Sequence, residues 1–497
     1  MIVGDAKGIF ISGLEDFPLG RRALRGIRLV HTHLKNEPLS QDDLTDLALL
    51  RLDIIAAIGV KDNLPDNIYT AHLMPRGSEK PMDVSPPVNF YRFNLDFISF
   101  IESLEEEMDR KRLFDQSEIR SPQRVARGDR GGKDLRERAI LISVSKKPKY
   151  EQEDSLEELR ELAFSSDVLV LDTVIQRPKD INPKYLMGEG KLKDVIINAL
   201  NKGATLLIFD QDLNPSQVKE IGALTELKVI DRSQLILDIF AKRAHSRDGK
   251  VQVELAQLKY RLPRLTGKGT AMSRLMGGIG GRGPGEMKLE IDRRRVRDRI
   301  TLLEKELKSL SEARKQRKQR RVEKMIPIVS IIGYTNAGKS TLLNSLTRSG
   351  VFVEEKMFAT LDTASRRLRF PKERDVIITD TVGFIRDLPK DLMTAFKSTL
   401  EELQDADLLL HLVDISNPRF EQQMESVENI LRELNLSDKK RIIVFNKTDK
   451  VAEDEIKNIA LRYNAIHVSA LRQSTFNPLL DVIEKNIWDE KLQEVQL

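Results

Sequence analysis

The chain has 497 residues and no cysteine; 40% of its residues are apolar, 32% charged and 5% aromatic. This composition excludes disulfide bonds and thiolate metal sites, and at about 150 residues per domain the length indicates three or four domains. The formal net charge is +5, yet residues 286–325 alone carry 15 Lys/Arg against 8 Asp/Glu. Such a localised basic element favours an anionic partner, with an ordinary solvated helix as the alternative.

The N-terminal part is predicted to be a separate α/β unit over residues 1–115. Apolar runs such as GIRLV (26–30) and DIIAAIGV (53–60) alternate there with helical patterns. Residues 116–138 are polar and contain paired glycines, which is typical of a linker. No apolar stretch approaches the roughly 18 residues that span a bilayer, and the first residues lack a secretory pattern. We therefore expect a cytoplasmic protein with no membrane span.

Two histidines at alternate positions, His31 and His33, precede Ser40 and Asp43. Two imidazoles and a carboxylate can bind Zn²⁺ and leave a position open for water. The pattern resembles the JAMM/JAB-type metalloprotease signature, although Leu34 replaces the usual proline and the spacing to Ser40 is short. No upstream catalytic glutamate is obvious; the nearest acids are Glu15 and Asp16. An active zinc hydrolase, a degenerate fold of that type and unrelated surface histidines all remain open.

Residues 139–232 are predicted to form a second α/β domain with a parallel sheet. Short apolar runs at strand length, AILISVS, DVLVLDTV, ATLLIFDQ and LKVID, alternate with helical stretches. From residue 233 the strand signal stops, and residues 233–265 read as one long helical pattern. A second helix is expected to run to about residue 324. Two long helices around a connection predict an antiparallel hairpin over residues 233–325.

The apolar seams of this hairpin have helical spacing, and its connection is basic and glycine-rich. The seam residues are Val251, Leu255, Leu258 and Leu262 in the first helix and Ile291, Val296, Ile300, Leu303, Leu307 and Leu310 in the second. Between the helices, Lys268, Arg274 and Arg282 stand among many glycines. We expect this tip to order against nucleic acid, while a plain flexible connection is the alternative.

Residues 326–490 carry the most specific signals. A strand, IPIVSII, runs into GYTNAGKS (333–340) and then into a helix, which is the P-loop pattern in its required context. Gly333 and Gly338 let the loop curl around phosphates, Lys339 reaches the β- and γ-phosphates, and Ser340 binds Mg²⁺. Asn336 in this loop resembles the asparagine with which potassium-activated GTPases hold K⁺ beside the phosphates; the alternative is that it stabilises the turn.

Three further motifs follow, each after a strand. DTVGF supplies Asp380 for Mg²⁺ and the Gly383 N–H for the γ-phosphate. NKTD (446–449) reads guanine, because a carboxylate accepts from both the N1–H and the exocyclic amine, and SAL (469–471) offers backbone N–H groups to the base. The motifs favour GTP over ATP. Phe384 stands where many GTPases have a glutamine that orients water, so this residue cannot perform that step.

The first switch should lie in FATLDT (358–363), where Thr360 and Thr363 are both candidates for Mg²⁺. With GGRGPGE, GYTNAGKS, FATLD, DTVGFIRDLP and NKTD in this order, residues 139–490 resemble the HflX family of ribosome-associated GTPases. The resemblance implies that Thr360 joins Ser340 as a Mg²⁺ ligand, that a monovalent cation such as K⁺ can assist, and that Lys339, Thr360 and Gly383 act in hydrolysis. A further C-terminal domain of some relatives is expected to be absent.

The resemblance also implies that the protein binds GTP and GDP, docks on the large ribosomal subunit with its hairpin tip near the peptidyl-transferase centre, and splits stalled or idle ribosomes. Two alternatives stay open. One is a GTP-switched RNA-binding adaptor without splitting activity; the other is a metal hydrolase in residues 1–115 that is regulated by the G domain, residues 326–490. The predicted fold is an α/β multidomain protein with a P-loop G domain, a parallel α/β N-terminal domain and a long antiparallel helical hairpin. The residues expected to contact GTP are Gly333, Tyr334, Thr335, Asn336, Ala337, Gly338, Lys339, Ser340, Thr341, Phe358, Ala359, Thr360, Leu361, Asp362, Asp380, Thr381, Val382, Gly383, Asn446, Lys447, Thr448, Asp449, Ser469, Ala470 and Leu471.

Overall fold

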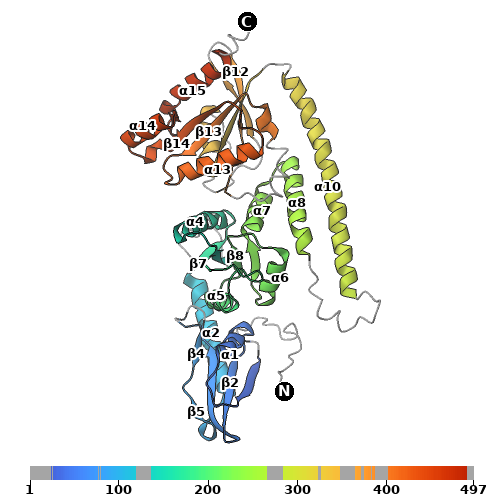
Figure 1. The fold of residues 1–497 in the computed structure, drawn as a ribbon, viewed down its shortest axis with the longest axis vertical. Helices are drawn as coiled ribbons and strands as arrows, with labels where there is room; N and C mark the ends of the chain where they lie inside the picture. The colour runs from blue at the N-terminus through green and yellow to red at the C-terminus, as the bar shows by residue number, and fades with distance from the viewer. Residues whose placement is uncertain are drawn as a thin grey trace. The chain divides into compact units, whose positions relative to one another are not determined.

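The chain folds into two compact units, residues 1–160 with 167–231 and residues 161–166 with 232–497. A computed structural model (Figure 1) describes residues 24, 26–75, 78, 80–118, 136–265, 284–322, 326–347, 357, 364–370, 374–381, 383–386 and 401–489. Within these ranges no helix combines the length and the apolar character needed to cross a bilayer.

The first sheet is mixed. Its strands follow the order β1-β2-β3-β4, with β5 paired to β3; β1 runs parallel to β2 and the other pairs are antiparallel. Asp62 and Asn63 connect β2 to β3, and both have the positive φ that a type I′ hairpin turn requires. The elements are β1 (Arg28–His33), α1 (Gln41–Leu49), β2 (Ile54–Lys61), β3 (Leu64–Leu73), β4 (Met82–Val84), β5 (Val88–Asn89) and α2 (Phe97–Glu118).

The second sheet has four strands, all parallel, in the order β7-β6-β8-β9. The four apolar runs of residues 139–232 each form one of these strands, and the two central strands, β6 and β8, are buried on both faces, as continuous apolar runs predict. Helices α4, α5 and α6 lie around this sheet (Figure 1). The elements are β6 (Arg138–Val144), α4 (Lys149–Ser165), β7 (Leu169–Gln176), α5 (Glu189–Asn201), β8 (Leu206–Phe209), α6 (Pro215–Ala223) and β9 (Lys228–Asp231).

The segment 233–265 is not one helix, contrary to the prediction. It forms α7 (Arg232–Arg243) and α8 (Arg247–Arg261), which are separated at residues 244–246. Ser246 has extended dihedral angles, and its hydroxyl accepts a hydrogen bond of 2.9 Å from the Gly249 N–H. A serine in this role starts a new helix, because its side chain satisfies a backbone N–H that lacks a helical partner.

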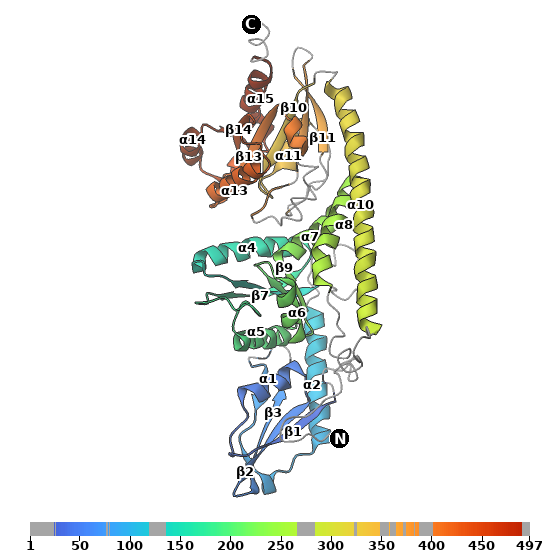
Figure 2. The same ribbon diagram turned by 45° about the vertical axis from the view of Figure 1, so that its right-hand side comes forward.

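Helices α8 and α10 (Pro284–Val322) pack side by side as an antiparallel pair (Figures 1 and 2). Their apolar contact is formed by Val251, Leu255 and Leu303, with Leu258, Ile300, Leu307 and Leu310 partly buried around them. Ile291 is 47% exposed, so the predicted seam does not extend to it. Arg299 forms two hydrogen bonds with Glu254, of 2.7 and 2.8 Å. Both side chains are substantially exposed, so this pair fixes the register more than it stabilises the fold.

The third sheet has six strands in the order β11-β12-β10-β13-β14-β15, and every pair except β11–β12 is parallel. Helices α11 and α15 pack on one face, and α13 and α14 pack on the other. The elements are β10 (Ile328–Gly333), α11 (Lys339–Thr347), β11 (Ala364–Arg369), β12 (Asp375–Asp380), β13 (Leu408–Asp414), α13 (Phe420–Glu433), β14 (Arg441–Asn446), α14 (Glu453–Arg462), β15 (Ile466–His467) and α15 (Asn477–Glu484).

A buried histidine in this third sheet makes the stability of the fold depend on pH. His411 on β13 is 1% exposed, and burial, with Arg441 and Lys339 nearby, lowers its pKa from 6.5 to about 4. The unfolded chain therefore binds a proton below pH 6.5 that the folded chain does not bind until about pH 4. Stability is lost as the pH falls through this window, by about 3 kcal/mol from this residue.

We expect His411→Gln to remove this part of the pH dependence, because glutamine does not titrate. Denaturant unfolding of wild-type and variant protein at pH 7, 6, 5 and 4 measures it, and the difference between the two curves should change by about 3 kcal/mol. The exposed His467 provides His467→Gln as the control for the same change of residue type at the surface. Parallel curves for His411→Gln would contradict the prediction.

Candidate nucleotide-binding site

Four strands of the third sheet end at one edge. The last residue of each strand is either a polar residue or, in one strand, a glycine with positive φ. These residues are Gly333, Asp380, Asp414 and Asn446. The strands β12, β10, β13 and β14 are adjacent and parallel, so their carboxyl ends lie together. In open α/β sheets this edge is where ligands bind.

The loop between β10 and α11 requires glycine at two positions. Gly333 has φ +149°, and a Cβ there would lie 2.2 Å from the Leu412 carbonyl oxygen. Gly338 has φ +93°, and a Cβ would lie 2.3 Å from Asn446 Nδ2. Asn336, between them, has φ +63° and an exposed side chain. The chain thus makes a tight turn before α11 begins, and a glycine-rich turn at a helix N-terminus is suited to bind an anion.

Lys339 is the first residue of α11, and its ammonium group lies inside this loop. The side chain is 6% exposed, and Nζ donates to the carbonyl oxygens of Gly333 at 3.1 Å and Tyr334 at 2.8 Å. Burial lowers the pKa of Lys339 to about 8, although Asp380 opposes this shift. A bound phosphate would supply the negative charge that this buried cation needs.

Ser340 and Asp380 form an oxygen pair beside that lysine. The Ser340 hydroxyl donates to Asp380 Oδ2 at 2.6 Å, and Asp380 is fully buried at the end of β12. A hydroxyl and a carboxylate next to a phosphate-binding loop are the donor set that Mg²⁺ takes in P-loop enzymes. These residues therefore fit a Mg²⁺–nucleotide.

The side chain of Phe384 points into the protein interior, and its backbone is hydrogen-bonded to the P-loop. The side chain is 2% exposed. Its N–H donates to the Gly333 carbonyl at 3.1 Å, and its carbonyl accepts from the Thr335 N–H at 2.8 Å. A Cβ at the neighbouring Gly383 would lie 3.0 Å from Lys339 Nζ, so this glycine lies against the lysine; its predicted contact with the γ-phosphate stays a prediction. The phenylalanine is a packing residue here, and it has no polar atom for a water molecule.

The predicted base-reading motifs, NKTD and SAL, lie next to each other. Asn446 connects them to the P-loop: its Nδ2 donates to the Ala337 carbonyl at 2.8 Å, and its Oδ1 accepts from the Ala470 N–H at 2.9 Å. The Ser469 hydroxyl donates to Asp449 Oδ1 at 2.6 Å, and this hydrogen bond lowers the pKa of Asp449. The carboxylate is therefore ionised at neutral pH, as recognition of two N–H donors requires.

The SAL triplet differs in one respect from the expectation. The Ser469 N–H donates to Thr475 Oγ1 at 3.0 Å and the Ala470 N–H donates to Asn446, so both donate to protein acceptors. Leu471 is 75% exposed. The contact between this triplet and the guanine O6 stays a prediction.

Part of the predicted site lies outside the described residues. Among the residues that are described, Tyr334, Thr335, Ala337 and Thr381 are buried, while Thr341 and Thr448 are half-buried. The members outside the described ranges are Phe358, Ala359, Thr360, Leu361, Asp362, Thr363 and Val382.

Asp414 is a site residue that the sequence motifs did not indicate. It ends β13, and its Oδ2 lies 2.7 Å from Nζ of Lys447. Lys447 has φ +61°, a left-handed conformation, and the ion pair fixes its long side chain across the sheet edge. Its position in the sequence could have indicated it, because Asp414 ends an apolar strand just as Asp380 does.

Comparison with known proteins places these features in one class. Three family profiles match successive segments: "GTP-binding GTPase N-terminal" over residues 153–241, "GTP-binding GTPase Middle Region" over 243–321 and "50S ribosome-binding GTPase" over 328–447. A GTP-binding protein from Sulfolobus solfataricus, solved with GDP, is 28% identical over 71% of this chain and 98% of its own, with a TM-score of 0.39. The protein is a P-loop GTPase.

Relatives narrow the class to one family. GTPase HflX of Caldanaerobacter subterraneus subsp. tengcongensis is 47% identical over 355 residues, which is 71% of this chain and 82% of the relative. GTPase HflX of Escherichia coli is 41% identical over 322 residues, 65% of this chain and 75% of the relative. The chain belongs to the HflX family of GTPases.

Proposed function

We propose that this GTPase docks on the large ribosomal subunit, that docking completes its hydrolytic site, and that the cycle dissociates stalled or idle ribosomes. The observation that carries the proposal is the inward-facing, buried Phe384. An enzyme that lacks a water-orienting side chain at this position depends on another group, and a partner can supply it, as activating proteins do for other GTPases.

Within this proposal the site residues have separate roles. Lys339 binds the β- and γ-phosphates, Ser340 and Thr360 bind Mg²⁺, and the Gly383 N–H contacts the γ-phosphate. Asp449 accepts from the guanine N1–H and amine. Two observations support these assignments. Lys339 and Ser340 are the first residues of α11, and the Ser340 hydroxyl lies 2.6 Å from Asp380 Oδ2.

A monovalent cation is the second proposed cofactor. Asn336 is exposed on the turn of the P-loop, with φ +63°. An amide oxygen there could hold K⁺ beside the phosphates, where the ion would supply the charge that an arginine finger supplies elsewhere. Asparagine also tolerates this backbone conformation well, so the comparison of K⁺ with Na⁺ decides between the two roles.

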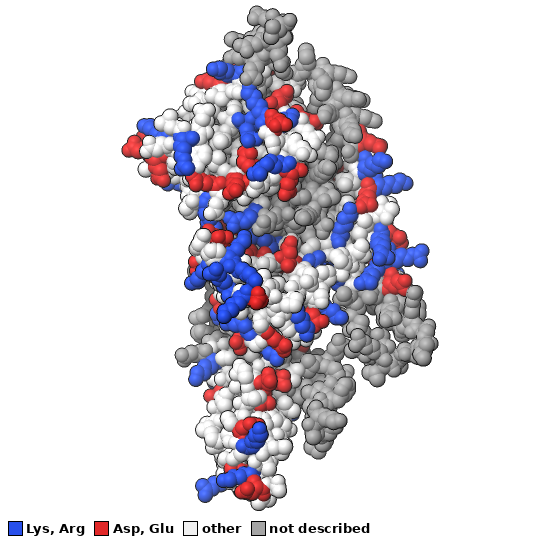
Figure 3. Space-filling model, in the orientation of Figure 1, with Lys and Arg blue, Asp and Glu red and all other residues white. Residues whose placement is uncertain are grey.

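The α8–α10 pair is the proposed ribosome-binding arm. The sequence of α10 contains 14 Lys/Arg and seven Asp/Glu, and blue and red side chains are mixed over its described middle part, residues 290–310, in Figure 3. A helix with this excess is attracted to the phosphates of ribosomal RNA. The residues proposed to contact RNA at the tip, Lys268, Arg274 and Arg282, lie outside the described residues.

We expect the double variant Arg274→Ala/Arg282→Ala to bind large subunits about 10- to 100-fold more weakly, because two cationic contacts to phosphate are lost. Its GTP affinity should not change. Co-sedimentation with purified large subunits measures the first quantity and nucleotide titration the second. Arg432→Ala/Arg462→Ala, which removes two exposed arginines of α13 and α14, is the control with the same change of charge.

Sucrose-gradient profiles of intact ribosomes mixed with the GTP-bound protein test the splitting step. The proposal predicts separate subunits at the expense of intact ribosomes, and fewer of them with the tip variant than with its control. Binding to large subunits without any gain of free subunits would support an RNA-binding adaptor instead. Unchanged co-sedimentation of the tip variant would remove the tip from the mechanism.

A further inference from the structure

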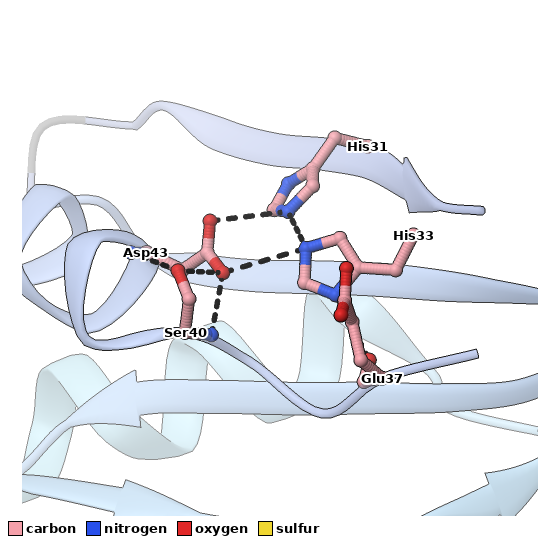
Figure 4. Close-up of polar contacts among 5 residues, drawn as sticks. All are labelled: His31, His33, Glu37, Ser40 and Asp43. Atoms are coloured by element: carbon pink, nitrogen blue, oxygen red, sulfur yellow. Dashed lines mark hydrogen bonds and ion pairs between the residues drawn. The ribbon is translucent and has the colours of Figure 1, made fainter. Parts of the chain in front are cut away.

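Two histidines and an aspartate converge in the N-terminal unit, outside the nucleotide-binding site. His31 and His33 are two residues apart on β1, so both side chains leave the same face of the strand. Asp43 lies in the first turn of α1 and points at them (Figure 4). In the part of the chain that the structure describes, this is the one group of three or more His, Cys, Asp or Glu side chains gathered closely enough to hold a metal ion.

The three potential ligand atoms have the separations of a coordination shell. The Nε2 atoms of His31 and His33 are 2.9 Å apart, His31 Nε2 is 3.2 Å from Asp43 Oδ1, and His33 Nε2 is 3.4 Å from Asp43 Oδ2. Ligands of a tetrahedral Zn²⁺ with bonds of about 2.0–2.1 Å lie about 3.3–3.4 Å from each other. Small adjustments would therefore bring all three atoms to one ion.

The hydrogen bonding of His33 fixes which of its nitrogens can bind a metal. Its Nδ1 lies 2.9 Å from the Glu37 carbonyl oxygen. A carbonyl only accepts, so the proton of the neutral ring is on Nδ1 and the Nε2 lone pair faces His31 and Asp43. A histidine ligand held by a carbonyl at its other nitrogen is the usual arrangement around a bound metal.

Asp43 is also held in place, with one oxygen left for the cluster. Asp43 Oδ2 accepts hydrogen bonds of 2.7 Å from both the N–H and the hydroxyl of Ser40. This capping box leaves Oδ1 directed at His31 Nε2. The His33 Nε2 lone pair and the Asp43 carboxylate then both face His31 Nε2. A single proton on His31 Nε2 can serve only one of these contacts well, whereas a cation would satisfy all of them.

We propose that His31, His33 and Asp43 form a binding site for Zn²⁺, with a fourth position completed by water. Imidazole nitrogens favour zinc and its neighbours over Mg²⁺ or Ca²⁺, which prefer oxygen ligands only. The side chains of the three residues are 27%, 13% and 17% exposed, so an ion and a water molecule can reach them. The site does not depend on the ribosomal function proposed above.

Isothermal titration of the full-length, chelator-treated, nucleotide-free protein with Zn²⁺ tests the site, and the visible spectrum after Co²⁺ addition reports the ligand geometry. We expect one Zn²⁺ per chain for the wild type. The affinity should fall at least about 100-fold in His31→Gln and Asp43→Asn, because each loses a ligand, and about 10- to 100-fold in Ser40→Ala, which keeps all three. His245→Gln, an exposed histidine elsewhere, should bind as the wild type does.

Circular dichroism of each variant without metal separates loss of a ligand from loss of the fold, and Ser40→Ala and Asp43→Asn are conservative changes that keep the side-chain volume close to that of the wild type. Absence of Zn²⁺ binding by the wild type would overturn the proposal and leave a hydrogen-bonded cluster. Equal Zn²⁺ affinity in the folded His31→Gln and Asp43→Asn variants would overturn it as well.

Discussion

Lys339→Ala is expected to lower the affinity for GTP by about 100-fold or more, the amount that loss of one partner of a buried charge pair produces. Lys339 is 6% exposed at the start of α11, and its ammonium group already lies in the curl of the P-loop, held by two carbonyl oxygens. Titration with a fluorescent GTP analogue measures the effect.

The substitution should leave the protein folded, because it removes a buried charge that is costly in the absence of phosphate. Lys457→Ala, which removes a surface lysine of α14 paired with Glu453, is the control and should bind GTP as tightly as the wild type. A folded Lys339→Ala protein with wild-type affinity would refute the assignment of this loop to phosphate binding.

The substitution Asp449→Asn should switch the nucleotide preference of the protein from GTP to xanthosine triphosphate. The ionised carboxylate accepts two hydrogen bonds from guanine, and each hydrogen bond to a charged group contributes about 1.5–3 kcal/mol. Their loss should weaken GTP binding by about 100- to 20,000-fold. Xanthine carries a carbonyl where guanine carries the amine, so the asparagine amide can donate to it.

Competition of both triphosphates for the same labelled nucleotide measures this exchange. Ser469 donates to Asp449 Oδ1 at 2.6 Å, and an asparagine oxygen can still accept this bond, so the loop should keep its conformation. Asp454→Asn on α14, an exposed carboxylate close by in sequence, should keep the preference for GTP. Retention of that preference by Asp449→Asn would show that another group reads the base.

The strand, loop and helix of the P-loop could be predicted from the sequence because their pattern is local. Phosphate binding needs glycines, a lysine and a hydroxyl at fixed spacing between a strand and a helix, and the structure has Gly333, Gly338 and Lys339 in that arrangement. The parallel sheet of residues 139–232 was predictable for a similar reason, since buried strands alternating with helices have few other solutions.

Long-range partners were not predictable in the same way. The pairing of Asp414 with Lys447 depends on which strands are neighbours, and the motifs alone do not state this. The break before α8 depends on Ser246, a residue type that occurs both inside and at the start of helices. The pairing of His31 with Asp43 depends on how α1 packs beside β1. The spacing of these residues in the sequence suggested a common site but could not establish their contact.

The rate of GTP hydrolysis with and without purified large ribosomal subunits is the most direct test of the proposed function. Because Phe384 offers no group for water, we predict slow turnover alone and a large increase with subunits, greater in K⁺ than in Na⁺ if Asn336 holds the ion. The Lys339→Ala variant should hydrolyse GTP neither alone nor with large subunits. Equal turnover of the wild type with and without subunits would contradict the proposal that the ribosome completes the site.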